Sequence, residues 1–378
     1  MDFGFTKEQK LIQNAFNEFS QKYIEPRAEE IDHSNVIPNE IMAGLAELDM
    51  FGIPFSSAYG GADGGFLNYV LALEQVAAAS GGIATVLGAH VLSTNAISRW
   101  GTEELKQQYM PACCNGEHIA SFAFTEPQTG SDPKQITSTA VRQGDHYILN
   151  GTKRFITNAS YPGPLVCFAR ENESGEITAF IVDKFCDGYT VSKPWEKIGM
   201  HGYPLLDIYL KDVKVPVENV LGEVGKGFAI LTTGICFGRV GVTTTSLGSM
   251  LGAYREAVKY SKERTHRDKA IGKFQQIQLQ IADIAATYEA CKWMTYHIGH
   301  VANTFKDETE LAREVSLAKN YVCEAAVDVA RKSLNVHGSY GLTNDYKISR
   351  IYRDAIVSPQ IEGVTNMQKI IAASTILR

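Results

Sequence analysis

One carboxylate near the C-terminus stands in surroundings that could turn it into a base. Glu362 lies between Ile361 and Gly363, in a segment that is otherwise uncharged. Burial among apolar side chains would raise its pKa and make it a competent proton acceptor, while Gly363 would let a ligand approach the backbone. The same pattern also fits a solvated glutamate before a turn glycine, so the local sequence leaves two interpretations open.

A second segment mixes hydroxyls, backbone amides and flat aromatic faces. It runs from Phe122 to Asp132 and includes Phe124, Thr125, Thr129, Gly130 and Ser131. Such a mixture suits a planar, hydrogen-bonding cofactor. An ordinary surface turn would have the same local composition.

The elements that must position these residues begin with a hairpin signal. Asn150-Gly151 stands between Tyr147-Ile148-Leu149 and Arg154-Phe155-Ile156. An Asn-Gly pair in this setting predicts a type I′ turn, which would hold Phe155 and Thr157 on a defined strand.

The pattern of the chain divides it into three blocks and predicts a mainly α protein with a central β domain. Residues 1–117 read as helices, with Thr6 as a candidate N-cap, and residues 118–225 as short β segments separated by turns. In residues 226–378 the helical period returns, and a long helix with one apolar stripe is expected from Leu311 to Val329. The last block is long enough for an antiparallel helical bundle.

The composition of the 378-residue chain is that of an ordinary globular protein. A hydrophobic share of 44% allows sizeable cores, and the length predicts two to three domains. The net charge of -6, without a dense Lys/Arg stripe, argues against nucleic acid as a partner. No signal sequence and no uninterrupted apolar run of about 18 residues is visible, so we expect no membrane association and a cytoplasmic location.

The seven cysteines are odd in number and show no CxxC pair and no Cys/His spacing of a zinc site. We therefore expect reduced, mostly buried thiols and no metal.

Several ordered motifs together resemble the acyl-CoA dehydrogenase family over nearly the full length. They are Phe124-Thr125-Glu126-Pro127 with Gly130-Ser131-Asp132; Leu149-Asn150-Gly151-Thr152-Lys153 with Ile156-Thr157-Asn158; Val213-Lys214-Val215-Pro216; Gly225-Lys226-Gly227-Phe228; Glu263-Arg264 with Phe274-Gln275; Tyr352-Arg353-Asp354-Ala355; and Glu362-Gly363. The resemblance implies an N-terminal helical domain, a middle antiparallel β-barrel or sheet, a C-terminal four-helix bundle, non-covalent FAD and a homotetramer.

The resemblance also implies a reaction. Glu362 would remove the α-proton of an acyl-CoA thioester while the flavin accepts hydride from the β-carbon, giving a 2-enoyl-CoA. The backbone N–H of Glu362 and a flavin hydroxyl would polarise the thioester oxygen. Electrons would pass to an electron-transferring flavoprotein.

By the same likeness, two flavin-binding stretches and a set of residues lent by a partner subunit hold the cofactor. The implied cofactor-binding residues are Phe122, Phe124, Thr125, Gly130, Ser131, Phe155, Ile156, Thr157, Arg264, Gln275, Asn335, Gly338, Ser339, Thr365 and Asn366. The implied substrate contacts are Ser131, Arg239 and Gly363. For Arg239, an internal ion pair is the competing interpretation.

The chain departs from the family pattern around the implied site. Some members carry the base immediately before the arginine equivalent to Arg239, where this chain has Gly238. The other departures are Cys236 for Asp, Arg267-Asp268 for Phe-Gly, Gln128-Thr129 for Gly-Ala, Asn335 for Gln, Ser339 for Gly, Ile361 for Tyr and Val364 for Thr. Together they indicate an atypical member.

The expected acyl pocket contains polar side chains, which favours a short or polar acyl group. They are Thr85, His90, Ser93, Thr94 and Asn95. His90 can also be a hydrogen-bonded helix residue without contact to a substrate.

Three alternatives to the acyl-CoA dehydrogenase remain. The same chemistry could act on an acyl group bound to an acyl carrier protein, as the change at Cys236 suggests. The protein could be an acyl-CoA oxidase or a non-redox relative. It could also be a helical interaction protein without cofactor, although Thr125, Arg264 and Glu362 together argue against that alternative.

Overall fold

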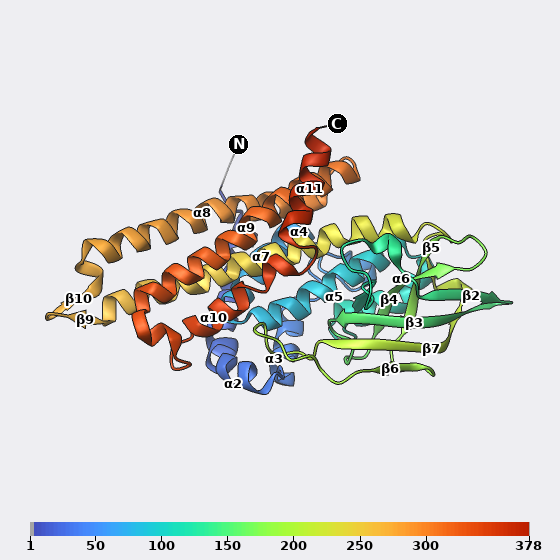
Figure 1. Ribbon diagram of the computed structural model, residues 1–378, viewed down its shortest axis with the longest axis horizontal. Coiled ribbons are helices and arrows are strands. Elements are labelled where there is room, and N and C mark those ends of the chain that lie inside the picture. The colour runs from blue at the N-terminus through green and yellow to red at the C-terminus, as the bar shows by residue number, and fades with distance from the viewer. Residues whose placement is uncertain (1–3, 378) are drawn as a thin grey trace.

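The computed structural model describes residues 4–377, with helices at both ends of the chain and a sheet between them (Figure 1). A capping box at Thr6, whose hydroxyl accepts from the Gln9 backbone N–H at 3.1 Å, begins the first helix. The N-terminal helices are α1 (Lys7–Phe19), α2 (Ala28–Ser34), α3 (Asn39–Glu47), α4 (Gly65–Ala79), α5 (Gly81–Trp100) and α6 (Glu103–Cys114).

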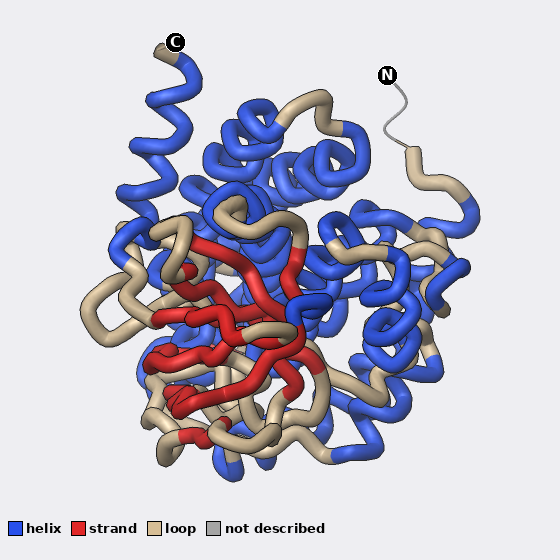
Figure 2. The backbone as a smooth tube through the Cα atoms, turned by 90° about the vertical axis from the view of Figure 1, so that its right-hand side faces the viewer, coloured by secondary structure: helices blue, strands red, loops and turns tan. Residues whose placement is uncertain are grey.

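The middle of the chain forms one eight-stranded sheet in the order β6-β7-β3-β2-β4-β5-β8, with β1 beside β4. Its strands are β1 (Ser121–Ala123), β2 (Thr139–Gln143), β3 (His146–Ile156), β4 (Pro164–Glu171), β5 (Ile177–Asp183), β6 (Tyr189–Val191), β7 (Leu206–Pro216) and β8 (Val220–Leu221). All pairings are antiparallel except those of β4 with β1 and with β2. Figure 2 shows the sheet lying against the helices.

The hairpin predicted at Asn150-Gly151 is wrong. Strand β3 runs straight through both residues, with a register shift against β7 at this point, and the tight turn lies instead between Gln143 and His146. An ideal Cβ on Gly151 would lie 2.1 Å from the Ser138 Oγ. The glycine is therefore required by a close contact inside the sheet. In the sequence alone, a glycine needed for such a contact looks the same as a glycine needed for a turn.

The C-terminal part is a bundle with a two-stranded hairpin at one end. It consists of α7 (Gly227–Glu263), β9 (Thr265–His266), β10 (Lys269–Ala270), α8 (Gln275–Thr304), α9 (Glu308–His337), α10 (Ile348–Ala355) and α11 (Thr365–Ile376). The apolar stripe expected on α9 is present, since Leu311, Val315, Ala318, Val322 and Val329 are all buried. Helix α7 is long and apolar enough to span a membrane, but 83% of its apolar window is buried inside the protein.

Helix α7 connects the three parts of the molecule. It packs against α4 and α5 from the N-terminal part, against α8 and α9 of the bundle, and against β5 of the sheet. Its glycines allow the closest approaches: an ideal Cβ on Gly241 would lie 3.3 Å from the Gly88 Cα on α5. One hydrophobic core therefore extends from the N-terminal helices through α7 into the bundle.

Candidate active site

Glu362 lies in the turn that leads into α11, with its carboxylate directed at α7. Its φ of 54° and the φ of 88° at Gly363 make two consecutive left-handed residues. An ideal Cβ on Gly238 would lie only 2.8 Å from the Glu362 Oε2 and 3.0 Å from the Leu92 Cδ2. The absence of a side chain at Gly238 thus makes room for the carboxylate against α7, beside Leu92 of α5.

Two cations lie near this carboxylate without forming an ion pair with it. Arg239 is buried and its Nε donates to the Glu362 carbonyl oxygen at 3.1 Å, while the Lys319 Nζ donates to the Gly363 carbonyl oxygen at 2.7 Å. Burial raises the pKa of Glu362, and the charges of Arg239 and Lys319 oppose this rise without cancelling it. A carboxylate with a raised pKa is suited to exchange a proton near neutral pH.

The segment that begins at Phe122 meets α7 one turn away from Glu362. An ideal Cβ on Gly234 would lie 3.3 Å from the Phe122 Cζ. Since Gly234 and Gly238 are four residues apart on one helix, they are separated by about 6 Å along its axis. The structure therefore brings together the two segments whose residue types suggested chemistry.

A buried ion pair shapes the loop that follows Phe124. The Lys153 Nζ donates to a carboxylate oxygen of Glu126 at 2.7 Å and to the Phe168 carbonyl oxygen at 2.6 Å. Glu126 also accepts from the backbone N–H groups of Thr137 and Ser138. Burial alone would raise the pKa of Glu126, but Lys153 and these hydrogen bonds outweigh burial and lower it to about 2.

This loop presents hydroxyls for a ligand. Within residues 4–377 the side chains of Thr125 and Ser131 have no hydrogen-bond partner, and Gly130 and Ser131 are exposed. Gln128 and Thr129, which depart from the family pattern, instead bond within the loop: Gln128 donates to Glu126 at 2.8 Å, and the Thr129 hydroxyl donates to the Asp132 carbonyl.

The second predicted cofactor stretch exposes an aromatic ring. Phe155 has a φ of 60° and is 51% exposed, an unusual backbone conformation for a bulky residue. The conformation is held by Asp207, whose carboxylate accepts from the Phe155 N–H at 3.3 Å and from the Trp195 Nε1 at 2.9 Å. Ile156 is buried and Thr157 is partly buried.

The remaining predicted cofactor residues do not join this group within one chain. The Arg264 guanidinium lies 5.2 Å from the Tyr340 ring centroid, close in sequence to Gly338 and Ser339. Gln275 and Asn335 are exposed. Figure 1 shows the adjacent β9–β10 hairpin at the opposite end of the molecule from the sheet.

Two further predicted residues lie on the way into α11. The Thr365 hydroxyl donates to Glu324 at 2.6 Å, and Asn366 is exposed in the first turn of the helix. Their roles toward a cofactor stay predictions.

Three family models match the chain in the order of its three parts. They are the acyl-CoA dehydrogenase N-terminal domain over residues 6–117, the middle domain over 121–213 and the C-terminal domain over 225–377. The chain belongs to the acyl-CoA dehydrogenase family. The predicted architecture and the predicted family are thereby confirmed, and the protein is an FAD-dependent oxidoreductase.

Relatives match the chain over its whole length. A short-chain-specific acyl-CoA dehydrogenase of Clostridium acetobutylicum is 35% identical over 382 residues, with 100% of both chains covered. A subunit of the caffeyl-CoA reductase-Etf complex of Acetobacterium woodii is 36% identical, with 99% of both chains covered. The structure of butyryl-CoA dehydrogenase from Megasphaera elsdenii has a TM-score of 0.96 and 32% identity, with 100% of both chains covered.

The residues on the sheet side of the site fit the isoalloxazine end of FAD. A planar ring requires flat apolar contacts and nearby donors, which Phe155 and the unpartnered hydroxyls of Thr125 and Ser131 supply. Arg264 at the other end can neutralise diphosphate oxygens. In this family member its neighbours Arg267 and Asp268, which replace Phe-Gly, both have positive φ and form the two-residue turn between β9 and β10.

The polar residues expected in the acyl pocket bond to neighbouring protein groups where their partners are known. The His90 Nδ1 accepts from the Ala120 N–H at 3.0 Å, and its ring packs edge-on against Phe51. Burial lowers the pKa of His90 to about 3, so the ring is neutral. It is the hydrogen-bonded helix residue of the second interpretation. The Cδ2 of the apolar Leu92, also on α5, lies 3.0 Å from the ideal Gly238 Cβ that the Glu362 carboxylate also approaches.

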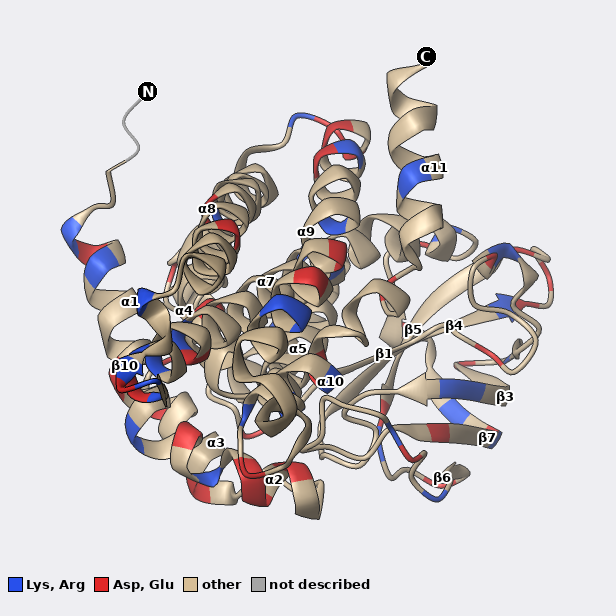
Figure 3. Cartoon of the chain, turned by 60° about the vertical axis from the view of Figure 1, so that its left-hand side comes forward, with Lys and Arg blue, Asp and Glu red and all other residues tan. Residues whose placement is uncertain are grey.

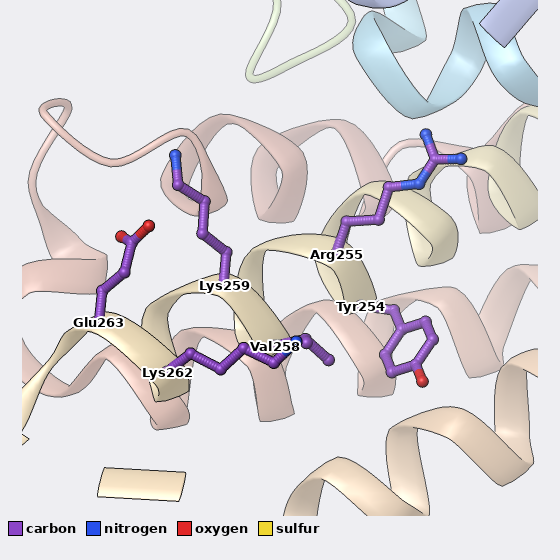
Figure 4. A pocket seen from close by; sticks show the side chains of 6 residues that line it. All are labelled: Tyr254, Arg255, Val258, Lys259, Lys262 and Glu263. Atoms are coloured by element: carbon purple, nitrogen blue, oxygen red, sulfur yellow. The ribbon is translucent and has the colours of Figure 1, made fainter. Parts of the chain in front are cut away.

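A shallow hollow elsewhere on α7 is separate from this site. It is lined by Tyr254, Arg255, Val258, Lys259, Lys262 and Glu263 (Figure 4). Tyr254 is sixteen residues from Gly238, about 24 Å along the helix. Within the described residues 4–377, no cluster of His, Cys, Asp or Glu is arranged to hold a metal ion.

Proposed function

We propose that the protein dehydrogenates a short acyl-CoA thioester between its α- and β-carbons, with Glu362 as the base. The observation that carries the proposal is the partly buried Glu362 carboxylate, with a raised pKa, lying against α7 one turn from the Phe122 segment. FAD, when bound, supplies the acceptor for the hydride. Glu362 takes the α-proton, the β-carbon loses hydride, and a C=C bond forms between the two carbons.

The developing charge on the thioester oxygen needs a donor. The backbone N–H of Glu362 makes no hydrogen bond within residues 4–377, so it is free to donate to this oxygen. A preorganised backbone donor stabilises an enolate-like transition state more than the ground state. Arg239 supports this role, because its hydrogen bond to the Glu362 carbonyl fixes the orientation of the same residue.

The surroundings of Glu362 favour a short acyl group. Leu92 lies beside the carboxylate, and Phe122 approaches α7 at Gly234 on one side. On the other side, one turn beyond Gly238, the backbones of α5 and α7 meet at Gly88 and Gly241. A long alkyl chain would have to separate these two helices. The similarity to short-chain and butyryl-CoA dehydrogenases supports the same substrate class.

We propose that electrons leave to an electron-transferring flavoprotein, as the similarity to a subunit of an Etf complex suggests. We also propose that the chain forms a homotetramer located in the cytoplasm. The separation of Arg264 from the sheet supports a cofactor shared between copies. Helix α11 supports association, since it stands away from the body (Figure 3), has one charged residue and exposes Ile370 by 59% and Ile376 by 62%.

A second candidate is the reverse reaction, reduction of a 2-enoyl thioester. The raised pKa of Glu362 favours it, because a protonated carboxyl would donate the α-proton. The relative in the caffeyl-CoA reductase-Etf complex supports this direction.

Anaerobic mixing tests both candidates. Oxidised holoenzyme with butyryl-CoA should lose its flavin absorbance, and reduced holoenzyme with crotonyl-CoA should regain it. The same acyl groups on a carrier protein form a parallel arm, and peroxide in air would indicate an oxidase. If no thioester in either arm changes the flavin spectrum, the proposed function is wrong.

A further inference from the structure

A lysine without a place in the reaction lies behind the turn that carries Glu362. Lys319 on α9 has no exposed surface, and its Nζ donates to two carbonyl oxygens, that of Gly363 at 2.7 Å and that of Pro359 at 3.3 Å. An ammonium group that is taken out of water is costly unless its hydrogen bonds are replaced. The two carbonyls that replace them flank Glu362 in sequence.

The turn needs such anchors because its backbone is strained. Glu362 is a non-glycine residue in the left-handed region, with a φ of 54°, where its Cβ crowds the backbone. Three side chains from three helices hold its carbonyls: Lys319 from α9, Arg239 from α7 and Gln368 from α11, whose Nε2 donates to the Gly363 oxygen at 2.9 Å. Lys319 alone reaches both ends of the turn.

We propose that Lys319 is a positioning residue for this reaction, which holds the turn 359–363 so that the Glu362 carboxylate stays against Gly238 and places a positive charge behind it. The inference rests on the proposed role of Glu362 as the base. It explains why a fully buried lysine stands in the apolar stripe of α9, between Val315 and Val322.

The charges around the carboxylate make the proposal measurable. Arg239 from α7 and Lys319 from α9 both lower the pKa of Glu362, against the effect of burial. Burial lowers the pKa of Lys319 itself, and Cys323, Glu362 and Glu324 oppose this effect. The Glu324 carboxylate also accepts from the Thr365 hydroxyl. Removing the Lys319 charge therefore leaves Arg239 as the one cation that opposes the effect of burial on Glu362, and the pKa of Glu362 rises.

The test is the pH dependence of flavin reduction in the Lys319→Met holoenzyme, measured anaerobically with butyryl-CoA. We expect FAD to be retained, the limiting rate to fall about tenfold or more, and the acid limb of the profile to move up by about one pH unit. Lys332→Met on the same helix is the matched control. Lys332 pairs with Asp283 and Asp328 at the surface, so its removal should move neither quantity.

Two further variants separate the anchor from the charge and cover a loss of folding. Lys319→Gln keeps a donor without the charge, so the acid limb should move while most of the limiting rate remains. Gln368→Leu removes a neutral anchor, so the rate should fall without movement of the limb. The proposal would be overturned if the variants that fold showed the wild-type limiting rate and the wild-type acid limb of the pH profile, even if their Tm were lower.

The parallel Glu362→Gln holoenzyme distinguishes a failure of this inference from a failure of the proposed function. If Glu362→Gln abolishes reduction while Lys319→Met behaves as wild type, only the role of Lys319 is wrong. If Glu362→Gln reduces its flavin normally, the proposed function itself is wrong.

Discussion

Gly238 and Glu362, 124 positions apart, share one volume: an ideal Cβ on Gly238 would lie 2.8 Å from the Glu362 Oε2 and 3.0 Å from its Cδ. A Cβ atom cannot lie this close to a carboxylate oxygen unless one of the two groups moves. The glycine that stands where some relatives carry their base is therefore also the residue that admits a base from another element. The two positions cannot both carry a large side chain in this arrangement.

Gly238→Ala should slow flavin reduction by about a hundredfold while FAD stays bound, because a displacement of about 1 Å is enough to misplace a catalytic group. Stopped-flow reduction with butyryl-CoA measures the effect. In a Glu362→Asp background the shorter side chain leaves room for the methyl group of the alanine. The same substitution should therefore lower the rate of flavin reduction by a much smaller factor. An equal loss of rate in both backgrounds would show that the contact between position 238 and the Glu362 carboxylate is not the cause.

The wild-type enzyme should lose activity in acid at a pH above the ordinary range of a glutamate. Burial raises the pKa of Glu362, and the base must be deprotonated, so the rate of dehydrogenation rises with pH through this raised pKa. Arg239→Met should move the limb to higher pH, because one opposing charge is lost, whereas Arg239→Lys should leave it nearly in place. An acid limb of the rate profile near pH 4.3, which is about the ordinary pKa of a glutamate, would contradict a buried base.

Leu92→Ala should widen the range of acyl groups. Leu92 is the α5 side chain beside Glu362, so its truncation leaves a cavity where a longer alkyl chain can lie. We expect the ratio of kcat/KM for hexanoyl-CoA over butyryl-CoA to rise by about tenfold or more, which corresponds to one or two buried methylenes. Val91→Ala on a neighbouring face of α5 is the control for a general loss of stability. If it raised the same kcat/KM ratio to a similar extent, the effect would come from lower stability and not from the space beside Glu362.

The three-block architecture and the family could be predicted from the sequence, because helical and strand periods are strong over long segments and the motifs occur in order. The close contacts between residues of different elements could not be predicted in this way. Asn150-Gly151 has the composition of a hairpin turn, and only the approach of Ser138 shows why glycine is needed within a strand. His90, by contrast, is the hydrogen-bonded helix residue that the sequence already allowed, since its Nδ1 accepts from the Ala120 N–H.

Two anchoring lysines were missed, although Lys319 left a signal in the sequence. Lys319 interrupts the apolar stripe of α9 between Val315 and Val322, a place where a charged residue needs a buried partner. Lys153 was part of a motif, but its partner Glu126 lies 27 positions away, and nothing in the spacing joins them. Which side chains meet across elements is decided by packing, and packing is not visible in a single sequence.

Glu126→Gln should loosen the loop that presents Thr125 and Ser131. It leaves the Lys153 ammonium buried without its charge partner, a loss of about 3 to 5 kcal/mol in the free energy of unfolding. We expect weaker retention of FAD, measured by equilibrium dialysis. Glu171→Gln is the control, because Glu171 is a buried carboxylate of the same sheet that accepts from the loop N–H groups of Glu173 and Ser174 and forms no ion pair within residues 4–377.

The stability difference between wild type and Glu126→Gln should depend on pH. The folded-state pKa of Glu126, about 2, lies below the ordinary value of 4.5 for a glutamate, so the ionised form is favoured by folding. This contribution is complete above pH 4.5 and is lost as the pH falls toward 2. Denaturant unfolding at pH 7 and pH 3 should show a smaller difference at pH 3; a constant difference would mean that the carboxylate is not stabilised by Lys153.

The most direct measurement of the central claim is single-turnover flavin reduction in Glu362→Gln holoenzyme, with butyryl-CoA and without oxygen. The glutamine keeps the size of the side chain and removes the base, so the account predicts normal FAD content and thioester binding with a reduction rate at least about a thousandfold below wild type. Reduction within a few fold of the wild-type rate would contradict the account, because another group would then have to take the α-proton.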